Sequence, residues 1–94
     1  MRIVWTAEAL DDLEEILAYY YLEAGPETAE AVERRIISQI EALCAFPERI
    51  RNSDRIPNAR ELVISKLPYI VFVRILPKKI IVLNVVHTAR KFPA

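Results

Sequence analysis

The residues of this 94-residue chain whose side chains could do chemistry gather in its last third, residues 60–93. Arginines and lysines interrupt the apolar runs of this segment, and His87 is the side chain that titrates near neutral pH without a perturbing environment. Such cations bind phosphates or acidic groups. The candidate residues are Arg60, Arg74, His87, Arg90 and Lys91. We expect the function of the chain to reside in this segment.

The charges of the chain are divided between its two halves. Residues 1–46 hold three Lys/Arg against ten Asp/Glu and residues 47–94 hold ten against three, so the halves carry −7 and +7. Acidic residues favour helix N-termini and basic residues protect strands and loops, which explains the division without any binding role. A basic surface that meets phosphates or an acidic partner explains it equally well. The sequence leaves both interpretations open.

Length and composition indicate a single domain, residues 1–94, with one core of modest size. Cys44 is the only cysteine and His87 the only histidine, so we expect no intrachain disulfide and no metal site. The sequence contains no cofactor-binding motif, and we expect no cofactor. It has no signal-peptide pattern and no apolar run near the roughly 18 residues that span a bilayer. We therefore expect a cytoplasmic protein that makes no membrane contact.

Two amphipathic helices are expected to position the candidate residues. Residues 2–5 predict a short strand, and Thr6 is a suitable N-cap for a helix whose apolar residues recur every three or four positions. Gly25 and Pro26 end that helix and start a second one, which is predicted to run to about Phe46. Two such helices joined by a tight turn form an αα-hairpin.

Four side chains of this hairpin have two possible roles. Tyr19, Tyr20 and Tyr21 are consecutive, and because neighbouring helical side chains point about 100° apart, at least one of them is expected to be exposed. They form either a docking or base-stacking surface, or part of the core with their hydroxyls at its rim. Cys44 has no acid or base partner in sequence, so we interpret it as a small core residue.

Three strands are expected after a polar loop at residues 47–59, in the segments 60–65, 69–76 and 80–87. If alternation is unbroken, both faces of the last two strands are apolar apart from Arg74 and Asn84, which are either the floor of a site or an edge-protection device. Such a sheet must be covered on both faces. The hairpin covers one face, and nothing left in the chain covers the other. This pattern predicts a second chain, as homodimer or heteropartner, on the open face.

The segments RELVI, LPYIVFVRI and VVHTARKFP, in this order after Ala9-x-x-Asp12-Leu13, resemble the RelE/ParE superfamily of toxins from bacterial type II toxin–antitoxin systems. The resemblance is closest to the ParE-like branch and covers almost the whole chain from Trp5 onward. It implies an α+β fold in which an αα-hairpin packs on one face of a small, mostly antiparallel sheet, in the order β-α-α-β-β-β. It also implies a role in plasmid stabilization and growth arrest.

The resemblance further implies a cognate, ParD-like antitoxin whose C-terminal segment wraps and neutralises the toxin. Such a segment folds on binding, as a helix along the hairpin and an extended run at the sheet. Operator DNA would be contacted only indirectly, through the antitoxin. The residues expected to meet the antitoxin are Leu17, Tyr20, Tyr21, Ile37 and Phe72.

The superfamily divides by target, since ParE-like members poison DNA gyrase and others cut messenger RNA in the ribosomal A site. RNA cleavage would use the candidate cations of residues 60–93 other than Lys91, with Glu48 or Glu61 as base. The last tyrosine is Tyr69, so the C-terminal tyrosine of several ribonuclease members is absent, and no lysine pair like that of the RelE branch is evident. We therefore favour gyrase, with all five candidates at the target surface. A metal-independent, ribosome-dependent endoribonuclease and a non-toxic dimeric binding module are the alternatives.

Overall fold

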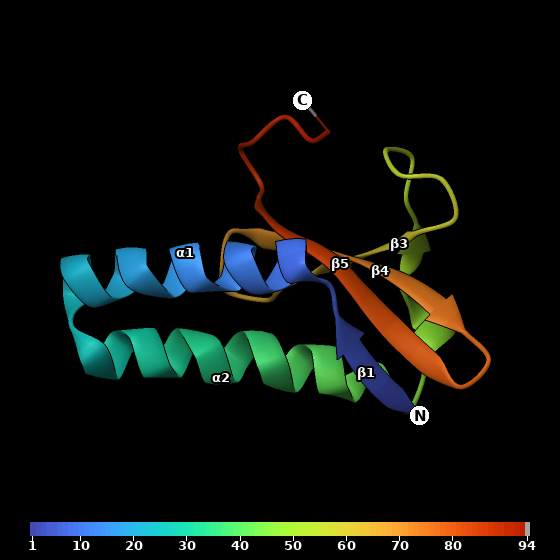
Figure 1. The fold of residues 1–94 in the computed structure, drawn as a ribbon, viewed down its shortest axis with the longest axis horizontal. Helices are drawn as coiled ribbons and strands as arrows, with labels where there is room; N and C mark the ends of the chain where they lie inside the picture. Colours follow the sequence, from blue (N-terminus) through green and yellow to red (C-terminus); the bar gives the residue numbers. More distant parts are fainter. Residues whose placement is uncertain (94) are drawn as a thin grey trace.

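The computed structural model describes residues 1–93 and forms two helices and a five-stranded sheet (Figure 1). The elements are β1 (Arg2–Trp5), α1 (Ala7–Ala24), α2 (Pro26–Ala42), a 3-10 turn η1 (Pro47–Arg49), β2 (Arg51–Asn52), β3 (Arg60–Val63), β4 (Tyr69–Leu76) and β5 (Lys79–His87). The strand order is β1-β5-β4-β3-β2. β1 pairs in parallel with β5, and the other neighbours are antiparallel. The predicted α+β fold is confirmed, and the short β2 is added inside the predicted loop.

Local signals place the ends of the helices. The Thr6 Oγ1 accepts the Ala9 N–H at 3.0 Å and caps α1. Gly25 has φ 93° and donates its N–H to the Tyr21 carbonyl at 3.0 Å, after which Pro26 opens α2. The second helix ends at Ala42, four residues before the predicted end. Tighter i−3 bonds close residues 43–45, because the residue before Pro47 is excluded from the helical region.

The main core lies between the helix hairpin and one face of the sheet. The second helix contributes one buried stripe, at three- and four-residue spacing: Val32, Ile36, Ile40 and Leu43. It forms one cluster with Val71, Val73, Ile80 and Val82 of β4 and β5, and Cys44, which was predicted to be a core residue, is half-buried against this cluster. Burying each such branched side chain contributes about 1.5–3 kcal/mol, so this interface is the main source of stability.

A β-bulge in β5 changes which side chains face the helices. Phe72 pairs with Asn84, but the next residue of β4 pairs with Val82, so Leu83 is an extra residue in β5. Ile80 and Val82 lie in the hairpin core, and after the bulge Val85 does. The predicted unbroken alternation is therefore wrong beyond Val82, because one inserted residue exchanges the two faces of a strand.

The far face of the sheet is covered by the chain itself. Ile70, Phe72 and Val86 form a second cluster, against which Ile56 of the loop and Phe92 of the C-terminal tail pack. The Phe72 and Phe92 ring centroids are 5.2 Å apart, and Phe72 is 0% exposed. The prediction that nothing in the chain covers this face is wrong, because a polar loop and a basic tail each carry one apolar side chain that folds back.

Candidate functional site

Two of the candidate arginines support the loop at residues 47–59. In β3, the Arg60 Nη1 donates to the carbonyls of Ile50 at 2.8 Å and of Glu48 at 3.4 Å. In β4, the Arg74 Nε and Nη2 donate to the carbonyls of Asn58 and Pro57, both at 3.3 Å. Both arginines are half-buried. Because a guanidinium fork is rigid, these bonds fix where the loop leaves the sheet.

A buried carboxylate anchors the same loop. Glu61 is 4% exposed and accepts the Ser53 hydroxyl hydrogen at 2.7 Å, with the Arg55 Nε 3.7 Å away. The Ser53 Oγ in turn accepts the backbone N–H groups of Arg55 and Ile56, each at 3.0 Å. The Arg55 guanidinium carbon lies 5.7 Å from the centre of the Phe72 ring. Glu61, one of the two bases predicted for RNA cleavage, is thus enclosed by its own loop.

The other candidates lie at the opposite end of the sheet. His87 ends β5, and its Nδ1 accepts the Ala89 N–H at 3.0 Å, so the neutral ring carries its proton on Nε2. Its ring meets the edge of the Tyr69 ring at a centroid distance of 5.6 Å. Arg90 and Lys91 follow in the exposed tail. These three side chains therefore present donors and positive charge to solvent.

The strand register keeps the two groups of candidates apart. His87 pairs with Tyr69, whereas Arg74 lies five residues further along β4 and Arg60 pairs with Val73. At roughly 3.4 Å per residue, His87 and Arg74 are about 17 Å apart along the strand. The structure therefore does not bring the four residues named for RNA cleavage into one constellation.

An aspartate of α1 that the sequence analysis did not single out for a role holds the second half of β5, the strand that leads into the tail. The Asp12 Oδ2 accepts the Val85 N–H at 2.9 Å and the Asn84 side-chain amide at 3.2 Å. β1 pairs with β5 no further than Val82, so beyond that point β5 is an edge strand that α1 caps. The Thr6 hydroxyl adds a 2.9 Å bond to the Leu83 carbonyl. Asn84 therefore belongs to this cap and not to the floor of a site.

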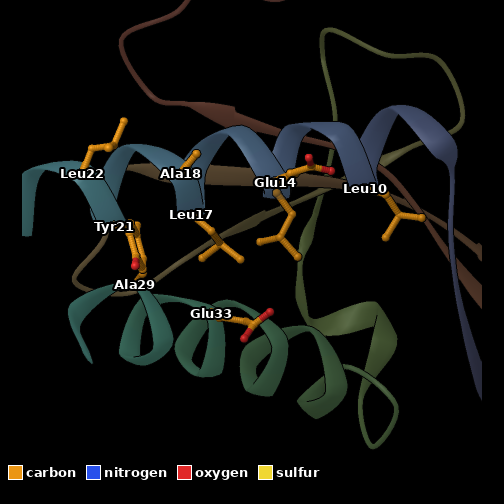
Figure 2. A pocket seen from close by; sticks show the side chains of 9 residues that line it. Leu10, Glu14, Leu17, Ala18, Tyr21, Leu22, Ala29 and Glu33 are labelled. Atoms are coloured by element: carbon orange, nitrogen blue, oxygen red, sulfur yellow. The ribbon is translucent and has the colours of Figure 1, made fainter. Parts of the chain in front are cut away.

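An apolar groove runs along the helix hairpin (Figure 2), and none of the candidate cations lines it. It is lined by Leu10, Leu13, Glu14, Leu17, Ala18, Tyr21, Leu22, Ala29 and Glu33. Tyr21 and Leu22 are 57% and 81% exposed. The predicted residues Leu17 and Tyr21 both lie here, and Ile37 is half-buried one turn beyond Glu33 on α2. Contiguous exposed apolar surface of this kind marks an interaction site.

Two of the predicted antitoxin contacts are turned into the protein. Tyr20 is half-buried, with its ring centroid 6.5 Å from that of Tyr69, and Phe72 has no exposed surface. Burial, together with a hydrogen bond to Tyr20, raises the pKa of Tyr69.

Sequence reasoning missed Leu10 and Leu22 of the groove. The spacing of Leu10, Leu17 and Tyr21, at i, i+7 and i+11, is the signal that could have found this stripe.

Comparison with known proteins assigns the chain to a family. The family model described as "ParE toxin of type II toxin-antitoxin system, parDE" matches residues 3–92. The chain belongs to the ParE toxin family. A Sinorhizobium fredii protein named "Putative toxin Y4kP" is 38% identical to this ParE-family chain over 92 residues, which are 98% of the chain and 93% of that protein.

Solved structures agree with the ParE assignment. A chain of the structure titled "Chromosomal ParDE TA system from P. aeruginosa" superposes with a TM-score of 0.83 at 26% identity, covering 93% of this chain and 95% of that one. The isolated E. coli RelE toxin gives a TM-score of 0.54 at 13% identity, covering 97% and 87%, and shares the fold. The predicted ParE-like toxin of a type II toxin–antitoxin system is confirmed.

No helix within residues 1–93 is long and apolar enough to cross a membrane.

Proposed function

We propose that this ParE-family toxin arrests growth by binding DNA gyrase, and that it works through protein contacts and does not cut RNA. The match of residues 3–92 to the ParE family carries the proposal. The resemblance to ParE-like toxins implies gyrase as the target. The geometry supports it as well. The residues named for RNA cleavage lie in two groups, and the donors of Arg60 and Arg74 are engaged by loop carbonyls. General acid–base cleavage requires its groups within hydrogen-bond reach of one phosphodiester.

The target surface in this proposal is the exposed end of β5 and the tail after it. His87, Arg90 and Lys91 are exposed there, and the Arg90 guanidinium carbon lies 5.9 Å from the centre of the Phe92 ring. Asp12 and Phe92 hold the two ends of this segment against the body of the protein. A positive surface of this kind meets acidic protein side chains or the phosphates of gyrase-bound DNA. Arg60 and Arg74 act as supports of the neighbouring loop.

Supercoiling of relaxed plasmid by purified gyrase and ATP tests the proposal. We expect the toxin to inhibit supercoiling or to trap cleaved plasmid, and Arg90→Ala with Lys91→Ala to weaken this effect. Lys78→Ala is the matched control, because Lys78 is an exposed cation in the β4–β5 turn at the other end of β5. Gyrase that is unaffected by the toxin, together with cuts in A-site messenger RNA on translating ribosomes, would contradict the proposal.

The same proposal assigns the helix-hairpin groove to a cognate antitoxin that neutralises the toxin. An amphipathic helix fits an apolar groove between two helices, with anchors at i, i+3 or i+4, and i+7. The closed far face removes the reason for expecting a homodimer there. We therefore place antitoxin binding on the hairpin, at Leu17, Tyr21 and the neighbouring Leu22.

Two tyrosines on one helix offer a matched test of the groove. Tyr19 and Tyr21 are both 57% exposed, but Tyr21 lines the groove and Tyr19 lies on the side of His87. Tyr21→Glu is expected to weaken antitoxin binding strongly and to restore toxicity during co-expression, whereas Tyr19→Glu should bind antitoxin normally. Equal affinities of the two variants for the purified antitoxin, measured by calorimetry, would contradict antitoxin binding in this groove.

A further inference from the structure

The division of charge along the sequence becomes a division between the two faces of the sheet. All ten acidic residues of residues 1–46 lie in α1 and α2, which pack on one face. The far face is covered by the loop at residues 47–59 and by the tail at residues 88–93, which both appear at the top of Figure 1. The loop and the tail hold five Lys/Arg against two Asp/Glu. An anion is therefore attracted to the far face and repelled by the helices.

Two of these arginines lie over a pair of aromatic rings where the loop meets the tail. The Arg55 guanidinium carbon is 5.7 Å from the centre of the Phe72 ring, and the Arg90 guanidinium carbon is 5.9 Å from the centre of the Phe92 ring. The two ring centroids are 5.2 Å apart. Only two neighbouring rings therefore separate the guanidinium groups, and cation–π attraction holds both groups in place before a ligand binds. We call these four residues the loop–tail seam.

Positive charge at the loop–tail seam is available to a ligand. Arg90 and the neighbouring Lys91 are exposed, and among residues 1–93 no ion pair engages either of them. Arg55 has an acidic neighbour in Glu61, whose Oε2 lies 3.7 Å from the Arg55 Nε, but the Glu61 side chain is 3% exposed and that of Arg55 is 35% exposed. A ligand in solvent therefore meets the guanidinium group and not the carboxylate.

The other acids near the loop–tail seam limit the direction in which the positive surface extends. Asp54 of the loop is exposed, but its Oδ2 lies 3.2 Å from the Arg51 Nη2, which compensates its charge. Asp12 and Glu15 of α1 line a small pocket together with Arg90. The positive surface therefore runs from Arg90 across the two rings toward the loop, and it does not continue onto the helices.

We propose that the loop–tail seam binds the phosphodiester backbone of duplex DNA directly. A guanidinium fork matches the oxygens of a phosphate, and one DNA strand presents a phosphate roughly every 3.4 Å along its axis, so a duplex offers a row of anions to the seam. Loop and tail present charge but no helix that could read a groove, so the contact is independent of base sequence. The choice of DNA rests on the proposed function, because gyrase would hold the toxin beside its own DNA substrate.

Fluorescence anisotropy of a short labelled DNA duplex tests direct binding by the full chain in the absence of gyrase. Contacts of Arg55, Arg90 and Lys91 with three phosphates predict that log affinity falls with log salt concentration with a slope of about −2.7. No binding at low salt would overturn the proposal. Poly-glutamate that competes as well as DNA at equal charge would overturn the assignment to phosphates, and tighter binding of a matched RNA duplex would overturn the choice of DNA.

Charge-removing variants test the location of the DNA contact. Arg55→Gln and Lys91→Gln should each weaken duplex binding about tenfold at low salt and reduce the salt slope by about 1. Arg34→Gln is the matched control, because it removes the same charge from an exposed residue of α2, and it should bind as the unchanged chain does. Equal weakening by Arg34→Gln and Arg55→Gln would overturn the seam as the site.

Two variants separate the loss of charge from a disturbed loop. Arg55→Lys keeps the charge beside Glu61 and should recover most of the affinity that Arg55→Gln loses. Lys91→Gln changes an exposed side chain without an ion pair among residues 1–93, so its effect on DNA binding does not pass through the fold. Unchanged DNA binding by Lys91→Gln combined with Arg90→Gln would overturn the proposal even if Arg55→Gln does not fold.

The supercoiling assay distinguishes failure of this inference from failure of the proposed function. A toxin that inhibits gyrase but binds no duplex at low salt would overturn the DNA contact and leave the action on gyrase in place. A toxin that binds the duplex through the loop–tail seam but leaves supercoiling unaffected would refute the action on gyrase and support the DNA contact. We expect both the binding of the duplex and the inhibition of gyrase.

Discussion

Replacing Asp12 by alanine is expected to lower the free energy of unfolding by about 2 kcal/mol. The Asp12 Oδ2 accepts the Val85 N–H at 2.9 Å and the Asn84 amide at 3.2 Å, at a point where β5 has no strand beside it. Hydrogen bonds to a charged group contribute about 1.5–3 kcal/mol, and a part-buried N–H left without a partner costs a similar amount. In a domain of this size the midpoint of thermal unfolding should fall by roughly 10 °C.

Asp11 provides the control for this prediction. It is the exposed neighbour of Asp12 on α1, so Asp11→Ala removes a like charge near the same helix N-terminus and gains the same helix propensity. It should change stability by no more than about 0.5 kcal/mol. Urea unfolding followed by the fluorescence of Trp5, the single tryptophan, measures both variants. Equal losses in Asp12→Ala and Asp11→Ala would refute the cap as the reason for the β5 geometry.

Three further substitutions test other parts of the structure. Glu61→Ala should lower the free energy of unfolding by about 2–3 kcal/mol and speed amide hydrogen exchange in residues 53–59, because Ser53 and Arg55 lose their buried partner. A loss below about 0.5 kcal/mol would contradict the role of Glu61 as an anchor of this loop. The pKa of Tyr69 is raised in the folded protein, so its contribution to stability is present below the unfolded-state pKa of about 10 and is lost as pH rises further. Tyr69→Phe should therefore flatten the fall in stability between pH 9 and 11. An unchanged slope would contradict this prediction. Arg74→Ala should cost about 1 kcal/mol by freeing two loop carbonyls, and a toxicity loss without any stability loss would argue for a direct contact of Arg74 with the target.

The hairpin and the class of the fold could be predicted because their signals are local. The Thr6 cap, the Gly25-Pro26 junction and the buried stripe that includes Ile36 each act within a few residues along the chain. The strand segments were also visible from their β-branched runs. The end of α2 was predicted too far along the chain. Residues 43–45, just before Pro47, form i−3 hydrogen bonds in place of the i−4 bonds of an α-helix, and no sequence signal marks this change.

The site was less predictable because it depends on contacts between distant segments. The bulge at Leu83 is coupled to a cap by Asp12, more than 70 residues away in sequence. The cover of the far face relies on Ile56 and Phe92, each a single apolar residue in a polar stretch. Sequence periodicity cannot detect such isolated anchors. The candidate cations were grouped by their place in residues 60–93 and by the family resemblance, and the strand register places them at opposite ends of the sheet.

The order in which DNA synthesis and protein synthesis stop after induction of the toxin tests the central claim, action on gyrase, most directly. Cells expressing the toxin without antitoxin are pulsed with labelled thymidine and labelled methionine, and the two incorporation rates are compared over the first minutes. Action on gyrase predicts that DNA synthesis falls first while protein synthesis continues. An immediate stop of protein synthesis with continuing DNA synthesis would contradict the claim and restore the ribonuclease alternative.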